Sequence, residues 1–404
     1  MAGVARTSPR TLTAVCLAGL GWAFSFGLGA PLAALWMRDA GCSAKVVGLN
    51  TSVYFLGAAA AALWAPALMK KAGRWCITLG ILVDALSTAL FPLAPGLTVW
   101  FLLRLLGGLA SAVCLIPMET LINHNASPER RARDFGIYAF CVALGVGLGT
   151  LVGLPLYAWS PRLAFALGGL AALPAALIAH RGLPRVIGPM EEETRGARPS
   201  MMGNRLSLGA SWVQGFLEGG MLTFLSIHLL TLGYEEAQVG GLMAALFLGV
   251  VLFQTPSAWL ADRFGRLRVL AAFHGVLLVG LGCLPFCSGP VAVGVWLFIV
   301  GGCCAALYPL GLALLGERTP PAALARANAW YLACNCVGSL TGPVLIGAAI
   351  DYTHSQAALF AVGMAAVALV LVFWGAGSFA IAKTQKLPEN AHSDEAEAPR
   401  RMAG

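Results

Sequence analysis

Long apolar stretches separated by short polar joints dominate this chain. A helix needs about 20 apolar residues to cross the hydrocarbon core of a membrane. Twelve runs reach that length, at about residues 12–37, 46–69, 75–95, 97–123, 134–157, 162–181, 207–230, 237–261, 268–288, 291–316, 327–350 and 356–382. The pattern therefore predicts an all-α integral membrane protein with twelve transmembrane helices.

The same pattern occurs twice, with an offset of about 192 residues. Phe55–Gly57 returns as Phe247–Gly249, and Gly73–Arg74 returns as Gly265–Arg266. Many secondary transporters are built from such a parallel repeat of six hydrophobic segments, with the substrate site between the halves near the membrane midplane. We therefore expect two pseudo-symmetric six-helix bundles around a central cavity.

The polar segments divide the chain into four predicted parts. An N-terminal bundle covers residues 1–181, and a cytoplasmic linker follows at 182–206, where Glu191–Glu193 and several arginines gather. The C-terminal bundle covers 207–382. The polar residues 383–404 are expected to form a cytoplasmic tail.

Composition supports a membrane location. Of the 404 residues, 58% are hydrophobic and only 11% are charged, whereas soluble domains carry roughly 25% charged residues. If both termini lie in the cytoplasm, 22 of the 26 basic residues fall on the inner side, as the positive-inside rule expects. We therefore predict a multi-pass protein of the inner (cytoplasmic) membrane in contact with lipid, and the net charge of +8 gives no reason to expect a nucleic-acid partner.

The sequence shows no sign of catalysis. It has no phosphate-binding P-loop, no nucleophile motif and no metal-ligand spacing, so we expect no enzyme activity, cofactor or metal site. Nearly all of the eleven cysteines lie inside apolar runs, where they are expected to act as small buried hydrophobes. Nothing requires more than a monomer.

One polar joint carries a specific motif. The segment Ala258–Leu270 resembles the G-x-L-a-D-R-x-G-R loop of the major facilitator superfamily. The residues that match its second part are Asp262, Arg263, Gly265 and Arg266. The resemblance implies a latch that holds the inner gate closed. The copy in the first half keeps Gly73 and Arg74 but has Lys70 in the place of the aspartate.

Two further stretches extend the resemblance. Arg104–Gly108 is similar to the superfamily's R-x-x-x-G signature. Gly338, Gly342 and Pro343 resemble the glycine-proline motif of its antiporters, although that motif normally lies in span five and here lies in span eleven. The segments 119–138 and 307–343 resemble a narrower group, the YcaD-like bacterial transporters.

Glu218 is the first candidate for proton coupling. It lies halfway along the seventh run with Gln214 four residues before it, on the same helical face. Ionisable groups at membrane depth are costly and usually mark ion or substrate paths. The alternative is a protonated structural carboxyl bonded to a neighbouring helix.

Asp84 is the second candidate for proton coupling, and it lies at a depth similar to that of Arg104. Arg104 is placed to bind an anionic substrate, and the two residues are equally placed to form a structural ion pair. Glu119 near Arg130, Arg131 and Arg133, and Glu317 near Arg318, suggest ion pairs at the inner face.

In this superfamily, spans one, four, seven and ten line the cavity. The candidate wall residues on these spans are Trp22, Phe26, Arg104, Ser111, Met118, Gln214, Glu218 and Tyr308. Such a mixed apolar and polar wall suits an amphiphilic organic substrate.

The predicted function is secondary transport of a small organic solute by alternating access, with proton-coupled efflux through Glu218. A first alternative is uptake or facilitated diffusion of a small organic anion bound by Arg104. A second is a receptor or assembly factor that keeps the fold without transporting, which only the aspartate missing at Lys70 suggests.

Overall fold

The computed structural model describes residues 9–125, 128–185, 202–320 and 323–384, and nearly all of them are helical. The first group of helices comprises α1 (Pro9–Asp39), α2 (Ala44–Ala62), α3 (Ala65–Ala72), α4 (Arg74–Leu90), α5 (Leu97–Asn125), α6 (Pro128–Trp159) and α7 (Pro161–Gly182). The second group comprises α8 (Arg205–Thr231), α9 (Glu236–Leu252), α10 (Gln254–Phe264), α11 (Arg266–Cys283), α12 (Pro290–Glu317), α13 (Leu324–Thr353) and α14 (Ala358–Thr384).

Eleven helices in the described part of the chain are long and apolar enough to cross a membrane. The remaining predicted run, 46–69, falls on α2 and α3, which are separated at Leu63 and Trp64. Pro66 explains the break, because it has no N–H to bond the carbonyl group four residues earlier. The eighth run is divided in the same way at Phe253, next to Pro256. Residues 186–201 of the predicted linker and 385–404 of the predicted tail lie outside the described residues.

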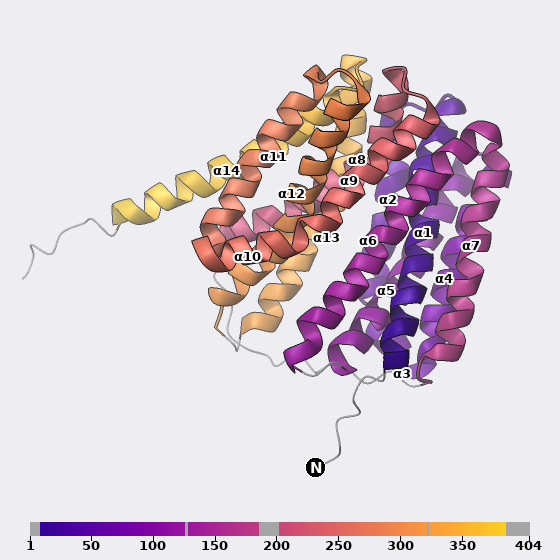
Figure 1. The fold of residues 1–404 in the computed structure, drawn as a ribbon, viewed down its shortest axis with the longest axis horizontal. Helices are drawn as coiled ribbons and strands as arrows, with labels where there is room; N and C mark the ends of the chain where they lie inside the picture. Colours follow the sequence, from indigo (N-terminus) through magenta and orange to yellow (C-terminus); the bar gives the residue numbers. More distant parts are fainter. Residues whose placement is uncertain (1–8, 126–127, 186–201, 321–322, 385–404) are drawn as a thin grey trace, which may run out of the picture.

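The two groups lie side by side (Figure 1), with the indigo-to-magenta helices of the first group on one side and most of the coral-to-yellow helices of the second on the other. Within the first group α1 packs on α6 and α7. Within the second, α8 packs on α13 and α9 packs on α12. We call the end of the molecule where α1 begins the terminal face, and the end with the joint between α1 and α2 the loop face.

Glycines repeat one packing relationship in both groups. Gly145 and Gly149 of α6 lie against the backbone of α1, where a Cβ atom would collide with Leu20 and Phe24. Gly338 and Gly342 of α13 lie against the backbone of α8 in the same way. Small residues allow such close approach between membrane helices, so the sequence repeat corresponds to repeated helix packing.

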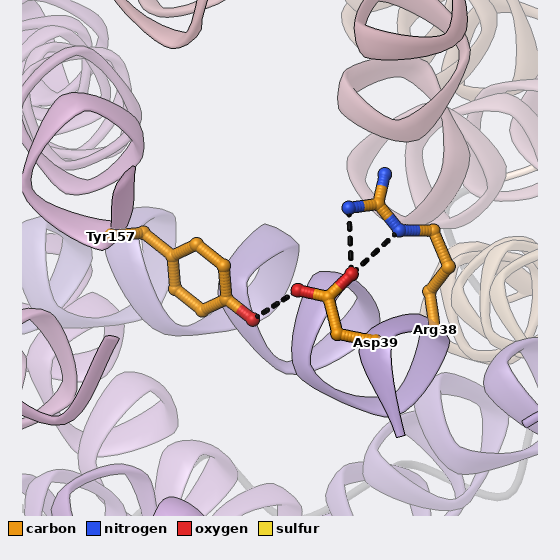
Figure 2. A network of polar contacts seen from close by, with 3 residues as sticks. All are labelled: Arg38, Asp39 and Tyr157. Carbon is orange, nitrogen blue, oxygen red and sulfur yellow. Dashed lines mark hydrogen bonds and ion pairs between the residues drawn. The ribbon is translucent and has the colours of Figure 1, made fainter. Parts of the chain in front are cut away.

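Near the loop face, α1 and α6 are also joined by polar side chains. Figure 2 shows the Tyr157 hydroxyl directed at one carboxylate oxygen of Asp39, to which it donates a hydrogen bond of 2.9 Å. The other oxygen accepts from the Arg38 guanidinium at 2.9 and 2.7 Å. This network fixes the end of α1 against the end of α6.

The two groups are bonded to each other near the loop face. Ser52 of α2 donates to the carbonyl oxygen of Leu340 at 2.6 Å, and Thr223 of α8 donates to the hydroxyl of Thr51 at 3.1 Å. Asp351 of α13 accepts from the start of α2. Among the described residues, the hydrogen bonds between the groups all lie in this half of the molecule, and Figure 1 shows the ribbons diverging toward the terminal face.

Candidate functional site

A small cavity in the second group contains Glu218. We call it the carboxyl cavity: α8 contributes Gln214, Glu218, Met221 and Leu222, and α9 and α12 supply the remaining walls. Its volume is about 90 Å³. The Glu218 side chain is exposed although it lies halfway along a helix whose other residues are mostly buried. Glu218 therefore faces open space inside the molecule.

A chain of amides holds this carboxylate. Gln214 donates from Nε2 to Glu218 Oε2 at 2.6 Å. Asn335 of α13 donates from Nδ2 to Gln214 Oε1 at 2.5 Å and to the Ser211 carbonyl oxygen at 3.0 Å. Both amides are neutral, and none of the ion pairs formed by the described residues includes Glu218. The carboxyl group is thus oriented by neutral side chains, and no basic side chain of the described residues is paired with it.

The corresponding positions of α1 carry aromatic rings. Trp22 and Phe26 stand 192 residues before Gln214 and Glu218, and their rings stack with centroids 5.5 Å apart. Phe26 also contacts the Tyr54 ring at 5.4 Å. One half of the repeat therefore presents an apolar stack where the other presents a carboxyl group.

Asp84 and Arg104 line the same cavity of about 10 Å³, room for about one water molecule. They bind different partners, and the described residues form no ion pair between them. Asp84 Oδ2 accepts from Trp22 Nε1 at 2.8 Å. Arg104 donates from Nε to Asn50 Oδ1 at 3.2 Å and from Nη2 to the Ala30 carbonyl oxygen at 3.2 Å. The ion pair considered from the sequence is not formed, and Arg104 is buried among acceptors of its own chain.

The other predicted wall residues do not line the carboxyl cavity. Ser111 is buried and donates to the Gly108 carbonyl oxygen at 2.9 Å, and Met118 is buried in the core of the first group. Tyr308 of α12 is half-buried and contacts Tyr331 of α13, with ring centroids 5.0 Å apart. Of the expected set, Gln214 and Glu218 are the members that line this cavity.

The predicted inner-gate motif lies at the joint between α10 and α11. Gly265 has φ of 90° there, a conformation that favours glycine. Arg266 donates to the Ala313 carbonyl oxygen at 3.0 Å and pairs with Glu317 at 3.2 Å, which ties α11 to the end of α12. Asp262 is largely exposed and lies 3.8 Å from Arg266, while the Arg263 guanidinium lies 5.7 Å from the Trp259 ring centroid. The described contacts of the motif stay within the second group.

The first-half copy of the inner-gate motif keeps the glycine and the arginine but lacks the aspartate. Gly73 has φ of 53° between α3 and α4, and Arg74 donates to the Leu183 carbonyl oxygen at 3.4 Å.

Of the predicted inner-face ion pairs, Glu317 pairs with Arg266, whereas Arg318 donates to the Gly203 carbonyl oxygen at 3.0 Å. The side chains of Arg130 and Arg131, two of the predicted partners of Glu119, lie outside the described residues, and the third, Arg133, is exposed and takes part in none of the ion pairs of the described residues.

Sequence reasoning missed three polar residues. Asn335 orients Gln214, Asn50 holds Arg104, and Asp351 joins α13 to α2. A polar side chain within an apolar run is the available signal for Asn50 and Asn335, but their partners depend on helix rotation. The described residues contain no group of three or more His, Cys, Asp or Glu side chains placed to hold a metal ion.

Comparisons with known proteins identify the family. The sequence profile of the Major Facilitator Superfamily matches residues 11–208 and again residues 207–400. The chain belongs to the major facilitator superfamily. As a member of that superfamily, it is a multi-pass membrane transporter, and its substrate is a small molecule.

Relatives of this transporter include proteins of several bacteria. It is 28% identical over 336 residues to the uncharacterized MFS-type transporter YfkF of Bacillus subtilis, covering 80% of this chain and 84% of the relative. It is 26% identical over 317 residues to the uncharacterized MFS-type transporter YcaD of Salmonella paratyphi B, covering 77% and 81%. The resemblance to YcaD-like transporters is thus confirmed at modest identity.

Solved structures share the fold of this transporter. The nucleoside transporter NupG, as its D323A mutant, matches with a TM-score of 0.76 at 14% identity, covering 91% of this chain and 99% of that one. A bacterial homologue of the human lysosomal transporter Spinster, in an inward-facing and occupied conformation, matches with a TM-score of 0.68 at 17% identity, covering 93% and 96%. At these identities the likeness shows the fold alone.

Proposed function

We propose that this transporter exports a small organic solute across the inner membrane in exchange for protons, and that Glu218 carries the exchange. The observation that supports the proposal is the exposed carboxylate of Glu218, bonded only by the neutral amide of Gln214 among the hydrogen bonds of the described residues. A group that binds either a proton or a cationic substrate, and not both, couples their movements in opposite directions. A solute with a positive charge or a strong hydrogen-bond donor suits this site.

The proposed architecture is two six-span bundles, residues 1–181 and 207–382, with the linker and both termini in the cytoplasm. In this proposal α2 and α3 together form the second span in chain order, which completes a set of twelve. The paired helix packing of α1 with α6 and of α8 with α13 supports this view. The terminal face is then cytoplasmic, as the distribution of basic residues favours.

In this orientation the hydrogen bonds between the groups lie toward the outside, which supports assigning this conformation to an inward-facing state. Transport then requires these bonds to break as the terminal face closes. We propose that Asp262 and Arg266 take part in that closure, since Asp262 is largely exposed and its 3.8 Å contact with Arg266 can be exchanged for a partner from the other half. We expect one copy of the chain to suffice.

The anion-uptake alternative has less support, because Arg104 is buried and donates to Asn50 and to backbone carbonyl groups. The non-transporting alternative rests only on Lys70, which stands where the motif has an aspartate.

A ligand screen tests the proposal. Purified protein in detergent is heated with lipophilic cations, sugars, organic anions, peptides or lipids at two pH values, beside the Glu218→Gln variant. A ligand at about 100 times its dissociation constant stabilises by roughly 2.7 kcal/mol, which a melting curve detects. We expect a cation that stabilises more at the higher pH, and only with Glu218 present. An anion that stabilises both proteins equally would contradict the proposal.

A further inference from the structure

A second cavity lies between α6 and α9, on the seam between the two groups of helices. We call it the seam groove. Its volume is about 480 Å³, within the range of roughly 300–1,000 Å³ found for small-molecule sites. Its lining consists of Phe, Leu, Val, Ala and Gly residues only. It therefore offers no hydrogen bond from a side chain and fits an apolar occupant.

The seam groove lies at membrane depth. Its residues fall within 140–151 of α6 and 241–252 of α9, inside two candidate membrane spans. Leucines at its edge are exposed, including Leu148 at 38% and Leu248 at 53%. Toward the loop face the helices come together, and a Cβ atom on Gly240 would lie 3.0 Å from the Leu151 carbonyl oxygen. The groove is thus closed by backbone contact near the loop face and borders the hydrocarbon region along its length.

Phe247 connects the seam groove with the carboxyl cavity. This half-buried residue lines both spaces, and Glu218 lines the second. Its position is fixed from the α6 side, because a Cβ atom on Gly147 would lie 3.0 Å from the Phe247 Cβ. A movement of the Phe247 ring would therefore join an apolar channel from the membrane to an unpaired carboxylate.

We propose that the substrate is an amphiphilic cation that enters sideways from the membrane, with its hydrocarbon chain in the seam groove, its charged head at Glu218, and Phe247 as the gate between them. The apolar lining selects the chain, and the unneutralised carboxylate selects the head. The choice of a positive head group rests on the proposed function. The groove and its gate rest on the geometry of α6 and α9.

Photolabelling in proteoliposomes tests the inference. The probe is a dodecyltrimethylammonium ion with a diazirine near the chain end, and the control is dodecanol with the same diazirine. We expect the cation to label residues 140–151 and 241–252, and Glu218→Gln to lower that labelling about tenfold, because the quaternary ammonium loses its ionic partner. Equal labelling by both probes, unchanged by Glu218→Gln, would overturn the inference and show that the groove is a binding site for ordinary lipid chains.

Substitution in the groove gives an independent arm. Ala244 lines the seam groove but not the carboxyl cavity, so Ala244→Trp should fill the groove and remove most labelling by the dodecyl cation. Stabilisation by tetramethylammonium, which has no chain, should remain. Leu369→Trp, at a 63% exposed position of α14 outside the groove, is the matched control and should leave labelling unchanged. If Ala244→Trp does not fold, Ala143→Leu on the α6 wall serves the same purpose.

The outcomes separate this inference from the proposed function. Suppose that labelling of the groove depends on Glu218 but transport does not depend on the proton gradient. This result would contradict proton coupling and would still support the lateral site. If the Ala244→Trp variant were still fully labelled in residues 140–151 and 241–252, the lateral site would be overturned. Proton exchange at Glu218 would not be affected by that result, because the ligand screen tests it separately.

Discussion

The carboxylate of Asp351, near the end of α13, accepts a hydrogen bond of 2.8 Å from the backbone N–H of Ala44, at the start of α2. A second bond of 2.9 Å comes from the N–H of Lys45. The first N–H groups of a helix have no partner within the helix, so Asp351 caps α2 from the other group of helices. This cap joins the two groups at the loop face.

Asp351→Ala should loosen that face. Loss of a capping side chain costs about 0.5–2 kcal/mol, and here the loss favours separation of α2 from α13. Cys42 lies half-buried in the same loop-face cavity as Asp351. We expect its thiol to react faster with a membrane-impermeant maleimide in the variant.

Arg326→Ala is the control for this experiment, because Arg326 is exposed near the start of α13, at the opposite end of that helix from Asp351. It should leave the labelling rate of Cys42 unchanged. An unchanged rate in Asp351→Ala as well would show that the cap does not hold the face closed.

Gly342→Ala should destabilise the packing of α13 on α8. A Cβ atom there would collide with the backbone of Phe216, and overpacking costs roughly 1–3 kcal/mol. We expect a lower melting temperature in detergent. Gly275→Ala is the matched control, since a Cβ atom at Gly275 meets nothing within 4 Å, and alanine is the better helix former by about 1 kcal/mol. Equal melting of the two variants would contradict the close approach.

Trp22→Phe should destabilise the first group of helices, because it removes the indole N–H that Asp84 accepts at 2.8 Å. A buried acceptor left without its partner costs about 1–3 kcal/mol. Trp36→Phe on the same helix is the comparison, since the buried indole N–H of Trp36 has no hydrogen-bond partner among the described residues. A loss confined to Trp22→Phe, read from melting curves, is the expected result.

Charge reversal tests whether Asp84 and Arg104 have separate partners, as the structure shows, or form the ion pair considered from the sequence. Asp84 and Arg104 hold different partners. The double variant Asp84→Arg with Arg104→Asp should therefore fold no better than either single variant, as judged by the yield of monodisperse protein. Recovery of that yield in the double variant would show that the two charges depend on each other.

Much of the fold follows from the sequence, because membrane spans are recorded in long apolar runs. The predicted run 207–230 became α8, and the run 291–316 became α12, each within two residues of its bounds. The breaks at Trp64 and Phe253 were not predicted, because a proline inside an apolar run ends a helix in some contexts and kinks it in others.

The site was less predictable than the spans. Glu218 and Gln214 were found because a carboxyl group at membrane depth is conspicuous and a spacing of four residues places an amide beside it. The buried position of Met118 and the contact of Asn335 with Gln214 depend on how each helix is rotated. Apolar runs that are hydrophobic on all sides do not record that rotation.

Proton exchange at Glu218 is the central step of the proposed transport cycle. The measurement is the release of protons, followed with a pH-sensitive dye in weakly buffered detergent solution, when the tightest-binding cation from the ligand screen is added. Because a proton and a cation compete for one carboxyl group, lowering the pH should weaken binding and binding should expel the proton. We predict about one proton released per cation bound, and none in Glu218→Gln. Cation binding without proton release, or equal release from the variant, would contradict the account.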